Sequence, residues 1–98
     1  MLTCEIDPSF DYDEVTEELY AYVAWRDDEL CLLCAKGASH VHHIIFRSQG
    51  GKHRANNLAC LCEYCHNNLA HGPRATEIQR KLLKIVVKKE RQFRSDLL

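Results

Sequence analysis

Several features that mark large classes of proteins are rare or missing in this sequence of 98 residues. It holds two prolines and four glycines and no Pro/Gly/Ser-rich run, which excludes a fibrous or disordered chain. Eighteen consecutive apolar residues occur nowhere, so no membrane-spanning helix is expected. Because internal repeats and linkers are also lacking, residues 1–98 are expected to form a single domain.

The first residues are acidic and lack the apolar segment of a secretory signal. The sequence therefore predicts a cytoplasmic protein, or one of the host cytoplasm if it is phage-encoded, with no membrane partner. Because thiols stay reduced in that compartment, the six cysteines are expected to be metal ligands or buried small side chains rather than disulfides. A metal would also help a chain of this length, which buries little apolar surface.

Net charge is nearly absent, at −1, but the charges are segregated along the chain. Residues 1–29 hold ten acidic side chains and one basic one, whereas residues 30–98 hold twelve basic and four acidic ones. Such asymmetry is typical of proteins that bind nucleic acid, so DNA is the expected partner of the basic part. The acidic segment is either a solvated surface or a docking surface for a protein partner.

The first third of the chain predicts a helix and a strand. Apolar residues recur at helical spacing over residues 12–26, and Asp11 or Asp13 is available as the N-cap. A tight turn at residues 31–37 leads into a short strand at residues 39–43.

The middle of the chain predicts a polar loop over residues 44–57 and a second short strand at residues 58–61. A helix from about residue 63 should end at Gly72 and Pro73, since glycine tolerates a left-handed C-terminal position and proline cannot continue the helix.

The last expected helix, at about residues 76–95, is amphipathic. Its apolar face would carry Ile78, Leu82, Ile85, Val86 and Phe93. Its basic face would carry Arg80, Lys84, Lys88, Arg91 and Arg94. That basic face is an ordinary solvated face or a non-specific contact to a nucleic-acid backbone.

Two pairs of cysteines have metal-binding spacing: Cys31-x2-Cys34 and Cys62-x2-Cys65. This spacing presents paired thiolates to a tetrahedral zinc ion. The alternatives are buried free cysteines or a redox pair. Cys60 is expected in the core of the second strand, and Cys4 has no assigned role.

Histidines cluster around these pairs. His42 and His43 stand between them, with Asn57 before the second pair and His66 directly after it. Because neighbouring strand residues point to opposite faces, the two adjacent histidines must have different roles. One can bind a metal ion while the other faces a substrate water.

With this constellation the sequence resembles the HNH endonucleases, or ββα-metal (His-Me finger) nucleases, especially the zinc-knuckle class of phage stand-alone and McrA-like proteins. The resemblance covers about residues 25–72 and rests on the order of the motifs and the Asn-x8-His spacing. It implies an α+β fold with a zinc-stapled ββα-metal core at about residues 31–72, flanked by N-terminal and C-terminal helices. It also implies metal-dependent hydrolysis of DNA phosphodiester bonds, leaving 5′-phosphate and 3′-hydroxyl ends.

The resemblance also implies roles for single residues. His42 and His66 would ligate a catalytic divalent metal, His43 would be the general base, and Asn57 would hydrogen-bond across the loop to hold the His43 region. The four paired cysteines would hold a structural Zn²⁺. For the catalytic ion, imidazole ligands suit Mn²⁺, Ni²⁺, Co²⁺ or Zn²⁺ better than Mg²⁺, which prefers oxygen.

The sequence departs from the family pattern at two histidines. His40 stands where an acidic residue is common, and its role is left open. His71 follows His66 by five residues instead of four, which corresponds to about 500° of α-helical rotation and places it off the His66 face. His71 would therefore be a third metal ligand only if the helix unwinds near Gly72; otherwise it contacts phosphate or is a helix-end cation.

Basic residues of the loop are candidates for DNA phosphate contact, namely Arg47, Lys52 and Arg54, with His53 beside them. The alternative for each is a solvated loop position. Two other functions compete with catalysis: a non-catalytic zinc module that binds DNA or protein, and an accessory subunit that docks on a partner through its acidic segment.

Overall fold

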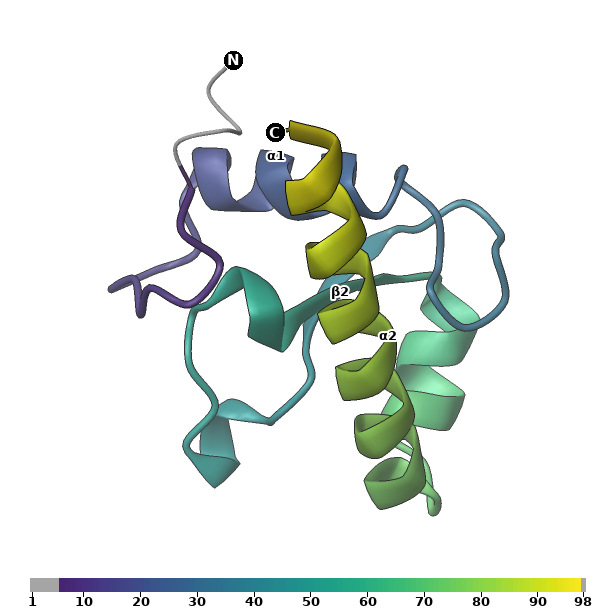
Figure 1. The fold of residues 1–98 in the computed structure, drawn as a ribbon. Coiled ribbons are helices and arrows are strands. Elements are labelled where there is room, and N and C mark those ends of the chain that lie inside the picture. The colour runs from purple at the N-terminus through teal and green to yellow at the C-terminus, as the bar shows by residue number, and fades with distance from the viewer. Residues whose placement is uncertain (1–5, 98) are drawn as a thin grey trace.

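The computed structural model describes residues 6–97, with side chains for residues 6–92. It is a mixed helix and strand fold (Figure 1). The main elements are α1 (Glu17–Arg26), β1 (His40–His43), β2 (Leu58–Leu61) and α2 (Ala75–Leu97). Three short helical segments complete it: η2 (Arg47–Gln49), η3 (Ala55–Asn57) and the π-helix η4 (Cys65–Ala70). The succession of β1, β2 and η4 is the expected ββα core, and the α+β fold class is confirmed.

β1 and β2 form a two-stranded antiparallel sheet. In its register His40 lies opposite Leu61, and His43 lies opposite Leu58. The predicted second strand has the bounds that β2 shows, and β1 begins one residue later than the predicted first strand.

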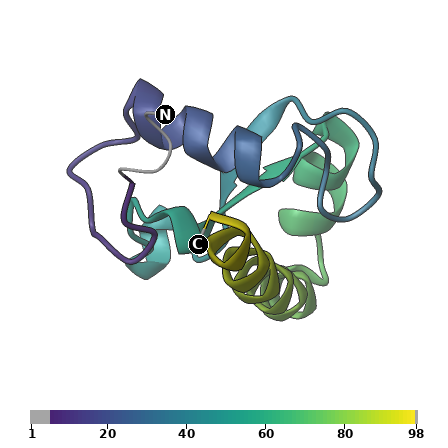
Figure 2. The same ribbon diagram turned by 45° about the horizontal axis from the view of Figure 1, so that its top comes forward.

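The two faces of β2 belong to two different cores. Ala59 and Leu61 pack in a cluster that includes Leu82 and Val86 of α2. The alternate residues Leu58 and Cys60 pack with Leu19, Tyr22 and Val23 of α1. The sheet is therefore covered by α1 on one side and by η4 and α2 on the other (Figures 1 and 2). Because both faces of β2 are buried, its sequence is a continuous apolar run, and Cys60 is a core residue as expected.

The start of α1 differs from the prediction of a helix from residue 12 with Asp11 or Asp13 as N-cap. The helix begins at Glu17, and Thr16 caps it by accepting a hydrogen bond from the Leu19 N–H at 3.2 Å. The chain before it is not helical: the Tyr12 N–H donates to the carbonyl oxygen of His53 at 3.0 Å in an isolated bridge. Pairing with a distant loop thus outweighs helical periodicity here.

The structural requirement for glycine at position 72 also differs from the predicted one. Its backbone is not left-handed; within residues 6–97 the glycine in that conformation is Gly50, at φ 84°. A Cβ atom at Gly72 would instead lie 2.2 Å from the carbonyl oxygen of Asn68. The residue is needed for a close backbone approach at the end of η4, after which α2 begins at Ala75.

α2 extends one residue further at its start and two at its end than predicted, and it buries Leu82 and Val86 as expected. Four members of the predicted basic face are exposed: Arg80, Lys84, Lys88 and Arg91. The side chains of Phe93 and Arg94 lie outside the described residues, as does Cys4. Within residues 6–97 no helix has both the length and the apolar character needed to cross a membrane.

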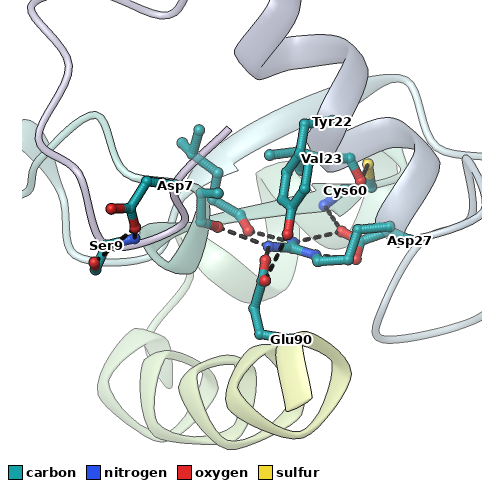
Figure 3. A network of polar contacts seen from close by, with 10 residues as sticks. Asp7, Ser9, Tyr22, Val23, Asp27, Cys60 and Glu90 are labelled. Carbon is teal, nitrogen blue, oxygen red and sulfur yellow. Dashed lines mark hydrogen bonds and ion pairs between the residues drawn. The ribbon is translucent and has the colours of Figure 1, made fainter. Parts of the chain in front are cut away.

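A buried arginine at the end of α1 joins three parts of the fold. Its two carboxylate partners, Asp27 and Glu90, are labelled in Figure 3. Arg26 forms ion pairs with Asp27 at 2.7 Å and with Glu90 of α2 at 3.0 Å. It also donates to the carbonyl oxygens of Ala55 at 2.7 Å and Leu58 at 2.6 Å. Burial by itself would lower the pKa of Arg26, but the two carboxylates outweigh burial and raise it. The guanidinium is therefore charged, and each of its three nitrogen atoms donates to at least one acceptor.

Candidate functional site

Four cysteine thiols converge beside the sheet. The sulfur atoms of all four lie within 4.8 Å of one another; the residues are Cys31, Cys34, Cys62 and Cys65. The two sulfur atoms of Cys34 and Cys62 are 3.6 Å apart. A tetrahedral zinc ion with ligands at about 2.3 Å holds its sulfur atoms about 3.8 Å apart. The arrangement fits such an ion, and the five cysteines of the described part of the chain are all free of disulfides.

The electrostatics of this cysteine cluster also favour a cation. Burial and the neighbouring thiols raise the pKa of Cys65. Burial opposes ionisation of Cys31 as well, but hydrogen bonds from backbone groups of Cys62, Leu33 and Cys34 outweigh it and lower the Cys31 pKa to about 7. Several thiolates crowded together repel one another, and a divalent ion removes that penalty. The cluster can therefore hold a metal ion.

A second group gathers three histidines, His42 of β1 with His66 and His71 of η4 and its C-cap. One ring nitrogen from each lies within 4.8 Å of the others. The ring centroids of His42 are 5.2 Å from both partners, and those of His66 and His71 are 4.7 Å apart. We call this the histidine cluster. Three neutral imidazoles at these distances can converge on one transition-metal ion.

The winding of η4 explains how His71 reaches the cluster. In an α-helix, which the sequence predicts here, a residue five positions later faces away. η4 is a π-helix, whose hydrogen bonds join residues five apart, so His66 and His71 lie about one turn apart on one side. The wider π-helical turn over residues 65–70 replaces the unwinding near Gly72 that the sequence suggests. The predicted alternatives for His71, a metal ligand, a phosphate contact and a helix-end cation, are all compatible with this position.

The histidine cluster lies in a cleft of about 200 Å³ that is also lined by His43, Phe46 and Arg47. We call it the histidine cleft. Phe46 stacks on His71 with ring centroids 4.8 Å apart and the planes 19° apart. Phe46 is not among the site residues predicted from the sequence. An aromatic residue in an otherwise polar loop was the signal that could have identified it.

His40, whose role the sequence leaves open, lies beside the histidine cluster. It lies two residues before His42, so both side chains project from the same face of β1. Its ring stacks on His66 with centroids 4.5 Å apart, and its Nε2 is buried without a hydrogen-bond partner. His40 thus packs against a member of the histidine cluster.

The environment favours the neutral form of two of these imidazoles, His42 and His66. Burial, followed by repulsion from His66, His71 and His43, lowers the pKa of His42 to about 4. Burial also lowers the pKa of His66. A neutral imidazole has the free lone pair that a metal ion requires, so His42 and His66 can bind a cation near neutral pH.

His43 follows His42 in β1, is half-buried and also lines the cleft. Its Nε2 is 3.0 Å from Nδ1 of His53. Burial, together with repulsion from His53 and Arg47, lowers the pKa of His43. The ring is therefore neutral near pH 7 and able to accept a proton.

Asn57 is buried and bridges the loop between the strands. Its Oδ1 accepts a hydrogen bond from the Ile45 N–H at 2.8 Å. Its Nδ2 donates to the carbonyl oxygens of Ile45 at 3.2 Å and Lys52 at 3.0 Å, and its own carbonyl oxygen accepts from the Ile44 N–H at 2.8 Å. These bonds fix the segment that directly follows His43.

The three candidate phosphate contacts are divided between two clefts. Arg47 lines the histidine cleft and donates a hydrogen bond to the carbonyl oxygen of Gly51. Lys52 and Arg54 line a separate cleft of about 370 Å³ between the loop and α2. Lys52 also forms an exposed ion pair with Asp11 at 3.7 Å, which contributes little to stability. The structure thus brings Arg47, and not the other two, beside the histidines.

Comparison with protein families gives a match for the segment that contains both clusters. Residues 29–72 match the family model described as HNH endonuclease. A comparison with curated proteins found no match. The family match covers both cysteine pairs, the two adjacent histidines, Asn57 and His71.

Proposed function

We propose that this protein is a metal-dependent DNA endonuclease of the zinc-knuckle HNH class, with His43 as its general base, because residues 29–72 match the HNH endonuclease model. The observation that carries the proposal is the convergence of His42, His66 and His71 beside His43 in one cleft. A module that only bound DNA would need neither three convergent imidazoles nor a separate histidine beside them. We also propose that residues 1–98 act as a single domain.

His42, His66 and His71 would hold the catalytic ion. Mn²⁺, Ni²⁺, Co²⁺ and Zn²⁺ suit three imidazole ligands, and Mg²⁺ suits them less. When bound, the ion would supply positive charge to the phosphoryl and leaving oxygens of the substrate. The low pKa of His42 supports this assignment, because the ring does not have to lose a proton before it binds the ion.

His43 would take the proton from the attacking water. A phosphodiester is anionic and repels hydroxide, so its hydrolysis needs a base that deprotonates water close to phosphorus. The lowered pKa of His43 keeps its ring in the form that accepts a proton. Asn57 would keep this base in place, because its hydrogen bonds fix the residues that directly follow it.

The four cysteines would hold a structural zinc ion, because four sulfur ligands complete a tetrahedron and leave no open position for chemistry. DNA is the proposed partner. Arg47 beside the histidines would neutralise a phosphate near the scissile bond, and Lys52 and Arg54 would contact phosphates farther away. A cytoplasmic location stays a prediction from the sequence.

The test is cleavage of supercoiled plasmid by purified protein across a series of divalent metals. We expect nicked and linear products with Mn²⁺ or Ni²⁺, carrying 5′-phosphate ends. Mild chelation should abolish cutting while the circular dichroism spectrum stays native, and adding Mn²⁺ should restore cutting. DNA binding without cleavage in any metal would instead support the non-catalytic binding module.

A further inference from the structure

One histidine of the loop has no part in the function described so far. His53 is half-buried, and its Nδ1 lies 3.0 Å from Nε2 of His43, with the two rings 66° apart. Its neighbours Lys52 and Arg54 line the cleft on the α2 side, whereas the His53 ring meets His43. His53 therefore contacts the proposed base. His43 lies in β1, whereas His53 lies in the loop that joins β1 to β2.

The backbone around His53 is held on both sides. The carbonyl oxygen of His53 accepts a hydrogen bond from the Tyr12 N–H at 3.0 Å, which ties the loop to the segment before α1. The carbonyl oxygen of Lys52 accepts one from Asn57 Nδ2 at 3.0 Å. The backbone that carries the His53 ring is therefore held by one long-range and one local hydrogen bond.

This contact can have either of two proton arrangements, with opposite consequences for catalysis. If His43 donates from Nε2 and His53 accepts at Nδ1, then His43 Nδ1 carries a lone pair and can take a proton from water. If His53 donates instead, the neutral His43 ring has its proton on Nδ1, and that nitrogen is no longer a base. The partner of a functional histidine commonly decides the tautomer in this way.

We propose that His53 is a positioning residue, which accepts a hydrogen bond from His43 Nε2–H at its own Nδ1 and so holds His43 in the tautomer and orientation that leave Nδ1 free as the base. The inference rests on the proposed function of His43. It adds that the base is oriented by a loop histidine and that His53 itself touches neither metal nor substrate.

Substitutions at His53 test the acceptor separately from the shape of the ring. His53→Ala removes both, His53→Phe keeps a ring without the acceptor, and His53→Asn places an amide oxygen close to the former Nδ1. We expect His53→Ala and His53→Phe to slow cleavage at saturating Mn²⁺ by about 10- to 100-fold, the usual effect of losing the partner of a functional histidine. His53→Asn should restore a rate close to wild type. Ser48→Ala, an exposed change in the same loop, is the control and should leave the rate unchanged.

A second measurement is independent of activity. In ¹⁵N-labelled protein loaded with diamagnetic zinc, the ring nitrogen shifts of His43, assigned by their loss in His43→Ala, report which nitrogen carries the proton. We expect a protonated Nε2 in the wild type and in His53→Asn, and a mixture of tautomers in His53→Ala. The Mn²⁺ concentration for half-maximal rate should stay the same in all His53 variants, because the metal ligands are untouched.

The outcomes separate this inference from the function on which it rests. If His43→Ala is inactive but His53→Ala cuts at the wild-type rate, the positioning role is wrong and the base assignment stands. A wild-type His43 with its proton on Nδ1, or a His53→Asn variant as slow as His53→Ala, also overturns the positioning role. If His43→Ala cuts normally, the base assignment fails, and the positioning role fails with it.

Discussion

The cysteine cluster and the histidine cluster are built from the same segment but differ in what they join and in how complete they are. Four thiols link the turn after α1 to the start of η4, whereas three imidazoles link β1 to η4 and its C-cap. Four sulfur ligands fill a tetrahedron; three imidazoles leave positions for water or substrate. One cluster can therefore stabilise the fold, while the other can support chemistry.

The two clusters are coupled in one direction. Cys65 and His66 are neighbours at the start of the π-helix, so a zinc ion at the cysteine cluster would also fix the position of His66. His66 is one of three ligands at the edge of a cleft, and nothing in the cysteine cluster depends on an ion there. We therefore expect loss of zinc to abolish both fold and activity, and loss of the second ion to abolish activity alone.

The largest effect should follow removal of zinc. Stripping it with a strong chelator, or replacing the buried ligand in Cys65→Ser, should unfold the domain, because a structural zinc site typically contributes about 10–16 kcal/mol to folding. Metal analysis of the native protein should give one tightly bound zinc per chain, and circular dichroism should follow the unfolding. Cys60→Ser, which changes a buried cysteine outside the cluster, is the control for zinc content. An unchanged melting temperature in chelator would contradict a structural role for zinc.

The buried arginine separates general loss of stability from loss of metal. Arg26→Met should lower the free energy of unfolding by about 3–5 kcal/mol, because it leaves Asp27 and Glu90 as uncompensated buried charges. The folded fraction should nevertheless keep its zinc. Arg80→Met changes an exposed arginine of α2 and should have little effect in the same urea titrations. A similar loss in both variants would show that the buried network is not responsible.

Within the histidine cleft, the two adjacent histidines should fail in different ways. His43→Ala should reduce the rate at saturating metal by about 10²–10⁴-fold, the usual contribution of a positioned base, with little change in metal affinity. His42→Ala removes a proposed ligand, so it should raise the Mn²⁺ concentration needed for half-maximal rate. Titrating Mn²⁺ against cleavage rate separates the rate defect from the affinity defect. His40→Gln, which keeps a polar side chain beside the cluster, is the comparison variant. If both variants changed only the metal requirement, His43 would be a ligand and not the base.

The smallest effects should come from the basic residues. Arg47→Gln and Lys52→Gln should each reduce the slope of log affinity for duplex DNA against log salt concentration by about 0.9, the value for one lost phosphate contact. Since Arg47 lines the histidine cleft and Lys52 does not, the saturating cleavage rate should fall in Arg47→Gln alone. Equal rates in the two variants would remove the distinction between the clefts.

Much of the scaffold could be predicted because its signals are local. The continuous apolar run of β2 and the amphipathic period of α2 fixed both elements to within two residues. The start of α1 could not be predicted in the same way. Tyr12 fits the helical period, but its backbone pairs with His53, and no local pattern reports a partner 41 positions away along the sequence. The Arg26 network was missed for a related reason, since buried and exposed charges look the same in a sequence.

The sequence by itself determined which residues are available for chemistry. These are two cysteine pairs at ligand spacing, adjacent histidines on a strand, and an asparagine between those histidines and the second cysteine pair. Spacing is sufficient for the cysteines because the two ligands of each pair come from one short segment of the chain. The tertiary structure alone decided that His71 lies with His66, that Arg47 and Lys52 belong to different clefts, and that His53 meets His43. These outcomes depend on the winding of η4 and on the path of a loop held by Asn57 and Tyr12. Packing and long-range hydrogen bonds set both, and local residue preferences carry no information about either.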